Sequence, residues 1–360
     1  MMSTYRESVR RKNSGEMMSK RFFACWLVLT GTLCAERLEL VLPTENYHLF
    51  SAESEKFYMY VDRTFEGQTS KPWEGGAFGY TRSPIRVGGQ VVMTRFHEGI
   101  DIAPVKRDKA GNPLDLVMSI AKGKVVHTSN VSGRSNYGKY AVVEHDWENS
   151  KVYSLYAHLA EITARVGDPV NAGSVLGRMG YTGAGLNRTR AHLHLELALL
   201  MSEYYKGWHK TYFGSPNYHG NFNGMNLSGV DVAAFFLEHK ANPDLKLSEF
   251  ILSRPVQFKV AIPAGNEEPE FLVRHPWMKR GDVPGAVSWE IGFAATGHPV
   301  SFTPSIRPIS QAVVSHIRPS EIPQRWLTRG LLTGAGQQTS LSSGGKQMLK
   351  LVLDDFPKID

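Results

Sequence analysis

The most constraining feature of this 360-residue chain is the run His192-Leu193-His194-Leu195-Glu196. Successive side chains of a β-strand point to opposite faces, so the two histidines and the glutamate would share one face and the leucines the other. The alternation predicts a strand with one apolar, buried face. It also predicts two imidazoles close enough together to serve one metal ion or one substrate.

A second polar motif lies upstream, where His97 and Asp101 are four positions apart in the run Phe96-His97-Glu98-Gly99-Ile100-Asp101. Histidine nitrogen and aspartate oxygen are both good zinc ligands, and a catalytic zinc uses three protein ligands while one position stays open for water. A third histidine, His158, follows an apolar run. Because a single histidine is usually a core or surface residue, the signal lies in the order of all five residues: His97, Asp101, His158, His192 and His194.

This order resembles the lysostaphin-type murein endopeptidases, a family of zinc peptidases with a His-x-x-x-Asp motif, a later Tyr-x-His-Leu and a final His-x-His. The runs between the motifs match as well, among them Gly123-Lys124-Val125-Val126 and Gly180-Tyr181-Thr182-Gly183. The resemblance covers roughly residues 75–200. It implies a mainly β fold, with the antiparallel β-sheet core of the lysostaphin-type metallopeptidases, which resembles a duplicated hybrid motif.

Carried over residue by residue, the resemblance implies that His97, Asp101 and His194 bind one Zn²⁺ per chain. His158 and His192 would stand beside the metal and serve water activation and transition-state stabilisation. The chemistry agrees, because zinc lowers the pKa of bound water toward roughly 7 and a neutral imidazole can pass a proton to the leaving amine. Glu196 could orient a ligand histidine, but a glutamate at a strand end is as often solvated, and we leave it outside the predicted catalytic set.

Two other zinc motifs do not fit the sequence. The helical His-Glu-x-x-His motif fails because Asp101 stands where its second histidine should be. The nucleobase deaminase motif needs a Pro-Cys-x-x-Cys partner, and the only cysteines of the chain are Cys25 and Cys34.

Residues 1–35 are predicted to be a secretory signal peptide. Lys20 and Arg21 precede an apolar run of about 14 residues, which ends at the small residue Ala35, and a membrane span would need about 20. Met17 or Met18 is an alternative start of translation, and an uncleaved membrane anchor is the alternative to cleavage. After cleavage we expect no transmembrane anchor, and a periplasmic or extracellular, cell-wall-associated protein.

Charge gives a weak guide to partners. The full chain carries a formal charge of +7, and removal of residues 1–35, with six basic and two acidic side chains, lowers it to about +3. No run of basic residues indicates nucleic acid binding. The resemblance instead implies that the partners are peptidoglycan peptides, and the sequence leaves the oligomeric state open.

The length predicts more than one folded unit. We expect an N-terminal segment at 36–74, a zinc metallopeptidase domain at 75–242 and a second, smaller α+β or β-rich accessory domain at 245–360. An aromatic loop at 204–226 would either wall the cleft or pack on its own domain. Predicted elements are helices at 230–239 and 323–332, a glycine-rich turn region at 334–345, and strands at 57–61, 256–262, 287–295 and 348–353.

The predicted function is therefore that of a secreted zinc metalloendopeptidase, which hydrolyses cross-links or stem peptides of bacterial peptidoglycan. One alternative is a metal-free wall-binding or amidase-activating scaffold of the same fold, although the presence of all five polar residues favours the enzyme. The other is a zinc peptidase acting on glycine-rich proteins or pentaglycine bridges.

Overall fold

The computed structural model describes residues 37–69 and 72–359. The predicted signal peptide and both cysteines lie outside the described residues. Residues 37–360 form one compact unit. Among the described helices, none combines the length and apolar character needed to cross a membrane.

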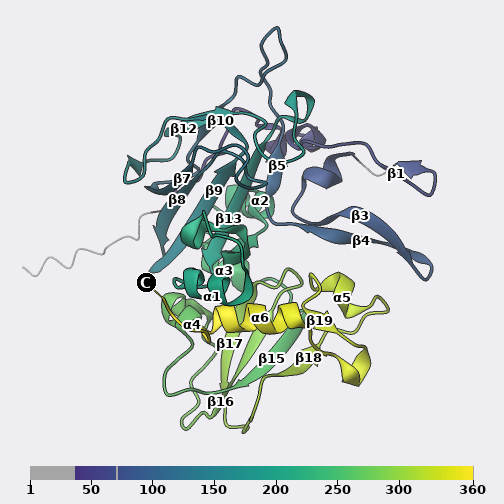
Figure 1. The fold of residues 1–360 in the computed structure, drawn as a ribbon, viewed down its shortest axis with the longest axis vertical. Coiled ribbons are helices and arrows are strands. Elements are labelled where there is room, and N and C mark those ends of the chain that lie inside the picture. The colour runs from purple at the N-terminus through teal and green to yellow at the C-terminus, as the bar shows by residue number, and fades with distance from the viewer. Residues whose placement is uncertain (1–36, 70–71, 360) are drawn as a thin grey trace, which may run out of the picture. The chain divides into compact units, whose positions relative to one another are not determined.

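A seven-stranded antiparallel sheet forms the centre of the fold (Figure 1). Its strand order is β11-β7-β8-β9-β13-β14, and β5 also pairs with β13. This confirms the predicted antiparallel β core. The strands are β5 (Ile100–Ile102), β7 (Gly123–Ser129), β8 (Tyr140–Trp147), β9 (Ser150–Ala157), β11 (Pro169–Val170), β13 (Leu193–Leu200) and β14 (Leu227–Val230).

Three smaller antiparallel units surround the central sheet. A three-stranded sheet has the order β10-β12-β6, and two hairpins pair β1 with β2 and β3 with β4. The long β3–β4 hairpin leads directly to His97, the last residue of β4. The bounds are β1 (Thr64–Phe65), β2 (Gln68–Thr69), β3 (Gly79–Val87), β4 (Gln90–His97), β6 (Leu116–Met118), β10 (Leu159–Ile162) and β12 (Val175–Met179).

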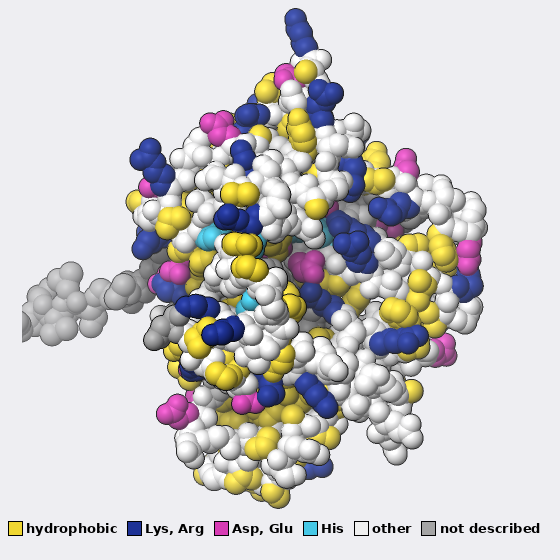
Figure 2. All heavy atoms as spheres, in the orientation of Figure 1, with side chains coloured by type: hydrophobic (Ala, Val, Ile, Leu, Met, Phe, Trp, Pro, Cys, Tyr) yellow, Lys and Arg dark blue, Asp and Glu magenta, His cyan; other side chains and the backbone are white. Residues whose placement is uncertain are grey.

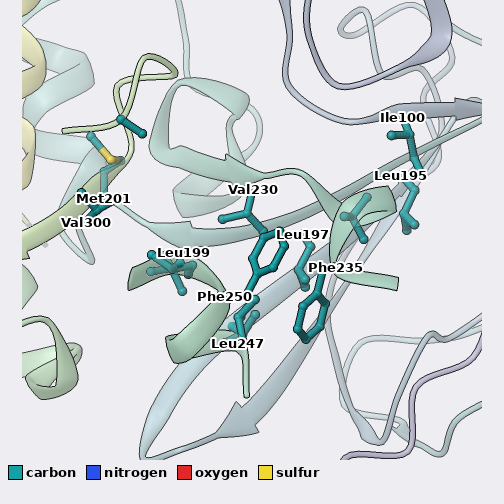
Figure 3. Close-up of a cluster of buried hydrophobic side chains, with 14 of the residues drawn as sticks. Ile100, Leu195, Leu197, Leu199, Met201, Val230, Phe235, Leu247, Phe250 and Val300 are labelled. Atoms are coloured by element: carbon teal, nitrogen blue, oxygen red, sulfur yellow. The ribbon is translucent and has the colours of Figure 1, made fainter. Parts of the chain in front are cut away.

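The alternation along β13 builds the core on one face of the sheet. Leu195, Leu197 and Leu199 are fully buried, and Figure 3 shows them in a cluster with Phe235 of α2 (Val232–Ala241) and Phe250 of α3 (Leu247–Leu252). The helix predicted at 230–239 is confirmed as α2, which begins after the cap Asp231. Burial of these large apolar side chains fixes which face of β13 presents its polar residues.

Residues beyond 245 form a second antiparallel sheet with the order β17-β16-β15-β18. The strands predicted at 256–262 and 287–295 are confirmed as β15 and β16. The accessory domain at 245–360 stays a prediction. The elements are β15 (Phe258–Pro263), α4 (Glu270–Arg274), β16 (Ser288–Phe293), β17 (Pro299–Ser305), β18 (Val313–Ile317), α5 (Gln324–Leu327), β19 (Leu332–Thr333), β20 (Ser340–Leu341) and α6 (Ser343–Val352).

The predicted C-terminal strand at 348–353 is wrong, because residues 348–352 belong to helix α6 and Leu353 is its C-cap. Ser342 caps the helix by accepting a hydrogen bond from the backbone N–H of Gly345 at 3.0 Å. Gly345 is therefore helical, although the sequence places it in a turn region. Its lack of a side chain is required, since a Cβ would lie 2.1 Å from the carbonyl oxygen of Leu331.

Three other predictions need correction. The strand at 57–61 is wrong, because a 3₁₀ turn ends at Phe57 and only an isolated bridge pairs Tyr58 with Ile102. The helix at 323–332 stops at Leu327, before Arg329 adopts a positive φ of 55°. The aromatic loop at 204–226 contains a helix, α1 (Tyr205–Tyr212), whose Tyr205 and Trp208 pack into the core.

Candidate metal centre and catalytic site

The register of β13 brings the predicted site residues together. His194 lies directly opposite Asp101 of β5 on one side. On its other side it lies opposite Ala157, the last residue of β9, and His158 follows Ala157 in the chain. Strand pairing alone therefore gathers residues that are far apart in the sequence.

His97, Asp101 and His194 form a compact, buried set of metal-ligand atoms. Their three ligand atoms lie within 4.8 Å of one another. His97 Nε2 is 3.1 Å from His194 Nδ1 and 3.1 Å from Asp101 Oδ1, and His194 Nδ1 is 3.0 Å from the same oxygen. Two nitrogens and one carboxylate oxygen at this spacing suit a tetrahedral zinc with one open position. The set therefore fits one Zn²⁺.

Gly99 permits the close approach of β5 to β13. A Cβ at this position would lie 2.3 Å from the carbonyl oxygen of Leu195. Any other residue between His97 and Asp101 at this point would push the two strands apart, so the glycine of the motif has a steric role.

Each of the four site histidines uses one ring nitrogen to donate to a protein oxygen. His97 Nδ1 donates to Ala77 O at 2.9 Å, His194 Nε2 to Glu196 Oε1 at 2.8 Å, His158 Nδ1 to Thr182 O at 2.9 Å and His192 Nδ1 to Arg190 O at 2.8 Å. These acceptors fix the orientation of each ring. The other nitrogen of each ring stays available for a metal or a proton.

Asp101 and His194 form an ionic pair in the protein without metal. Burial disfavours the charged carboxylate, but His192 and His97, with hydrogen bonds from His192 and His194, hold the pKa of Asp101 well below 3.8. Burial also works against charge on His194, yet its hydrogen bonds to Asp101 and Glu196 raise its pKa to about 10. The carboxylate of Asp101 is thus already ionised, as a metal ligand must be.

His158 is held neutral and in a strained backbone conformation. Burial, together with His192 and His194, lowers the pKa of His158 well below 6.5. Its φ of +64° lies in the left-handed region, which costs a residue with a side chain on the order of 1 kcal/mol. This turn between β9 and β10 brings its ring to within 4.7 Å of the His192 ring, measured between centroids. A neutral imidazole beside the metal set can accept a proton.

Glu196 belongs to the site, although it is not in the predicted catalytic set. It is 1% exposed, and its Oε1 accepts hydrogen bonds from His194 Nε2 at 2.8 Å and from Tyr137 Oη at 2.6 Å. The solvated alternative is therefore wrong. The alternation in His-Leu-His-Leu-Glu was the available signal, since it places Glu196 on the face of His194.

Arg82 supports the metal set from the β3–β4 hairpin. Its Nη2 donates to Asp101 Oδ2 at 2.6 Å, and its Nε donates to Gly75 O at 2.8 Å. The arginine binds Oδ2 of the carboxylate, and Oδ1 lies near His97 and His194. Arg82 lies in the glycine-rich run before the first metal motif, but no pattern in the sequence assigns it to Asp101.

All five predicted site residues line one cavity of about 650 Å³. Figure 2 shows histidine, acidic and basic side chains meeting at a hollow on this face. Met225 and its neighbours from the end of the 204–226 segment line the cavity, whereas Tyr205 and Trp208 pack inside the fold. The 204–226 segment thus both lines the cavity and packs on its own domain.

Comparison with known proteins agrees with this geometry. Residues 95–205 match peptidase family M23. These residues form a peptidase M23 domain. The M23 domain holds all five site residues, including the buried His–Asp–His set that fits one Zn²⁺.

Curated relatives of the M23 domain include two lysostaphins. Lysostaphin of Staphylococcus simulans is 31% identical over 122 residues, which are 33% of this chain and 20% of the relative. Lysostaphin of Staphylococcus staphylolyticus is also 31% identical over 122 residues, and the match covers 33% of this chain and 21% of that protein. The chain therefore spans about a fifth of the length of the curated relatives it matches.

Two solved structures are similar to part of the chain. The catalytic domain of the antimicrobial peptidase lysostaphin from Staphylococcus simulans is 22% identical, with a TM-score of 0.27, over 46% of this chain and 96% of that one. A zinc-containing peptidase from Vibrio cholerae is 27% identical, with a TM-score of 0.24, over 39% of this chain and 36% of that one.

Proposed function

We propose that this protein is a secreted zinc metalloendopeptidase that hydrolyses peptide bonds in bacterial peptidoglycan, in cross-links or stem peptides. The observation that carries the proposal is the convergence of one metal-ligand set and two further histidines, His158 and His192, in a single cavity within an M23 domain. Export rests on the predicted signal peptide, which lies outside the described residues.

In this proposal His97 Nε2, Asp101 Oδ1 and His194 Nδ1 hold the metal. A zinc ion bound there supplies polarisation of the scissile carbonyl and a bound water with a pKa near 7. Glu196 fixes the ring of His194, and Arg82 fixes the carboxylate of Asp101.

The two remaining histidines have separate tasks. His158 keeps Nδ1 on Thr182 O, so its Nε2 takes a proton from water and returns it to the leaving amine. His192 is held by its Nδ1 bond to Arg190 O and is placed to stabilise the developing oxyanion. A proton acceptor and an oxyanion-stabilising group, 4.7 Å apart between ring centroids, suit amide hydrolysis.

Digestion of intact peptidoglycan tests the proposal. The purified, zinc-loaded protein is incubated with peptidoglycan, with and without a zinc chelator, and the released muropeptides are identified by mass spectrometry. We expect chelator-sensitive conversion of cross-linked dimers to monomers, or shortening of stem peptides. His158→Ala serves as the matched control, because it should retain zinc and lose most turnover.

The alternatives predict different outcomes of the same digestion. A metal-free scaffold would bind peptidoglycan without zinc and release no muropeptide. A peptidase for glycine-rich chains would leave stem peptides intact and cleave a pentaglycine substrate. Either pattern would contradict the proposed function.

A further inference from the structure

We propose that the cavity selects peptides with carboxylate groups on the residues beside the scissile bond, and that Arg95 and Arg190 bind these carboxylates. The proposal rests on the proposed peptidase function and specifies its substrate class. It distinguishes acidic peptides from uncharged chains such as polyglycine.

The cavity is lined by an excess of arginine over acidic residues. Five arginines contribute to its walls, against three carboxylates, and no lysine does: Arg63, Arg82, Arg95, Arg190 and Arg329 face Glu98, Asp101 and Glu196. A bound zinc would add two further positive charges. An excess of arginine over carboxylate in the lining favours anionic groups in a ligand.

The three carboxylates already have partners within the protein. Glu98 accepts from Arg329 at 2.8 Å, Asp101 accepts from Arg82 at 2.6 Å, and Glu196 accepts from His194 at 2.8 Å. None of the three is thus available to neutralise a further arginine.

Arg95 and Arg190 keep their charges for a ligand. Within the part of the chain that the structure describes, neither guanidinium lies within 4.0 Å of a carboxylate oxygen. The side chain of Arg190 donates to the carbonyl oxygen of Gly185, at 2.9 Å, and its buried Nε has no hydrogen-bond partner among the described residues. Arg95 is exposed on the cavity wall. A ligand carboxylate would supply the anionic acceptor that neither side chain has among the described residues.

The cross-strand position of Arg95 supports the same conclusion. Arg95 of β4 lies directly opposite Arg82 of β3 in the antiparallel ladder, and both line the cavity. Like charges in directly opposite positions destabilise a sheet. Asp101 neutralises the charge of Arg82 only. A second anion beside Arg95 would neutralise the other charge and remove the remaining repulsion.

Arginine is also the residue that suits carboxylate recognition. Its planar guanidinium donates two parallel hydrogen bonds to one carboxylate, whereas lysine acts as a point charge. The two arginines come from different segments, since Arg95 belongs to β4 and Arg190 ends the 3₁₀ turn Arg188–Arg190 before β13. A peptide extended across the site can therefore present one carboxylate to each.

A pair of isosteric peptides tests this inference. The two peptides have the same length and sequence, with glutamate and a free C-terminal carboxylate in one, and glutamine and a C-terminal amide in the other. Their binding to the metal-depleted full chain is measured by fluorescence anisotropy, and their cleavage by the zinc-loaded chain gives kcat/KM. We expect the acidic peptide to bind at least about 10-fold more tightly, with a preference that falls as salt increases.

Two variants and one control assign the effect to the cavity. Arg95→Gln and Arg190→Gln should each lower the preference for the acidic peptide by about 10-fold. Arg165→Gln removes the same charge from an exposed position outside the cavity and should leave the preference as in the unmodified chain.

Separate outcomes overturn the inference and the proposed function. Equal binding of the two peptides, binding of neither, or equal loss of preference in Arg165→Gln would overturn the inference. Selective binding without cleavage of any peptide would contradict the peptidase function while the charge selection stands. Cleavage of both peptides with equal kcat/KM and equal affinity would retain the function and refute the selection.

Discussion

Glu196 Oε1 accepts a hydrogen bond from His194 Nε2 at 2.8 Å, and the two residues stand on the same face of β13. The bond turns the opposite ring nitrogen, Nδ1, toward Asp101 and His97. A second hydrogen bond, from Tyr137 Oη at 2.6 Å, holds the glutamate itself. The ligand set is therefore positioned by a buried chain of side chains behind it.

Removal of this support should weaken metal binding. Glu196→Ala frees the ring of His194 and should reduce zinc affinity by about 10- to 100-fold, as measured by competition with a chromogenic chelator. Tyr137→Phe is the matched control, because the glutamate keeps its bond to His194, and we expect a smaller loss. Unchanged zinc affinity in Glu196→Ala would show that the carboxylate does not position the ligand.

The predicted roles of the histidines separate in two variants. His194→Ala should lose zinc, whereas His158→Ala should keep zinc and lose at least about 100-fold in kcat. Metal content by atomic emission and turnover on peptidoglycan give the two readouts. Equal loss of zinc in both variants would refute this division of roles.

Zinc binding should release a proton near neutral pH. Without metal the pKa of His194 is raised to about 10, so the ring is protonated at pH 7, yet a ligand imidazole must be neutral. Zinc affinity should therefore increase with pH through the neutral range. Isothermal titration calorimetry in two buffers with different ionisation enthalpies counts the protons, and identical apparent enthalpies would contradict the expectation.

Acid should destabilise the fold through two buried histidines that lie outside the metal set. Burial lowers the pKa of His145 to about 4 and the pKa of His298 to about 4. The unfolded chain, in which histidine has a pKa near 6.5, binds protons more readily, so stability present above pH 6.5 is lost as pH falls toward 4. Each residue contributes up to about 3 kcal/mol to this loss.

Urea denaturation of the zinc-free protein at pH 7 and pH 5 measures this effect. His298→Gln removes one titrating group. Its free energy of unfolding should therefore decrease less between pH 7 and pH 5 than that of the unmodified chain. Comparison with the unmodified chain cancels the contribution of the metal ligands. The same decrease in both proteins would show that His298 does not carry the pH dependence.

Gly99→Ala should disturb both stability and metal binding. The added methyl group would stand 2.3 Å from Leu195 O, and the resulting shift of β5 against β13 should cost about 1–3 kcal/mol and displace Asp101 from His194. Thermal unfolding and zinc affinity would report the change. Gly89→Ala is the control, since a Cβ there meets nothing within 4 Å and should leave both properties unaltered.

The sequence predicts the centre of the protein better than its margins, for physical reasons. In β13 the polar and apolar positions alternate with the period of a strand, so one pattern encodes both the core and the site. In α6 the short apolar run at 348–353 fits a strand or a helix equally, and the capping bond of Ser342 decides for the helix. The same alternation is sufficient to predict that Glu196 shares a face with His194. The positions of Arg82 and Arg190 could not be predicted, because they depend on contacts between distant strands and loops.

The ion pair between Arg329 and Glu98 has a consequence for protein engineering. Glu98 lies between two predicted zinc ligands, whereas Arg329 comes from the segment after α5, outside the matched residues 95–205. A truncation after residue 242 would keep all five predicted site residues but remove Arg329 from the cavity wall and Phe250 from the core beneath β13. Chimeras that exchange only residues 95–205 would then carry the metal-ligand set without the native partner of Glu98.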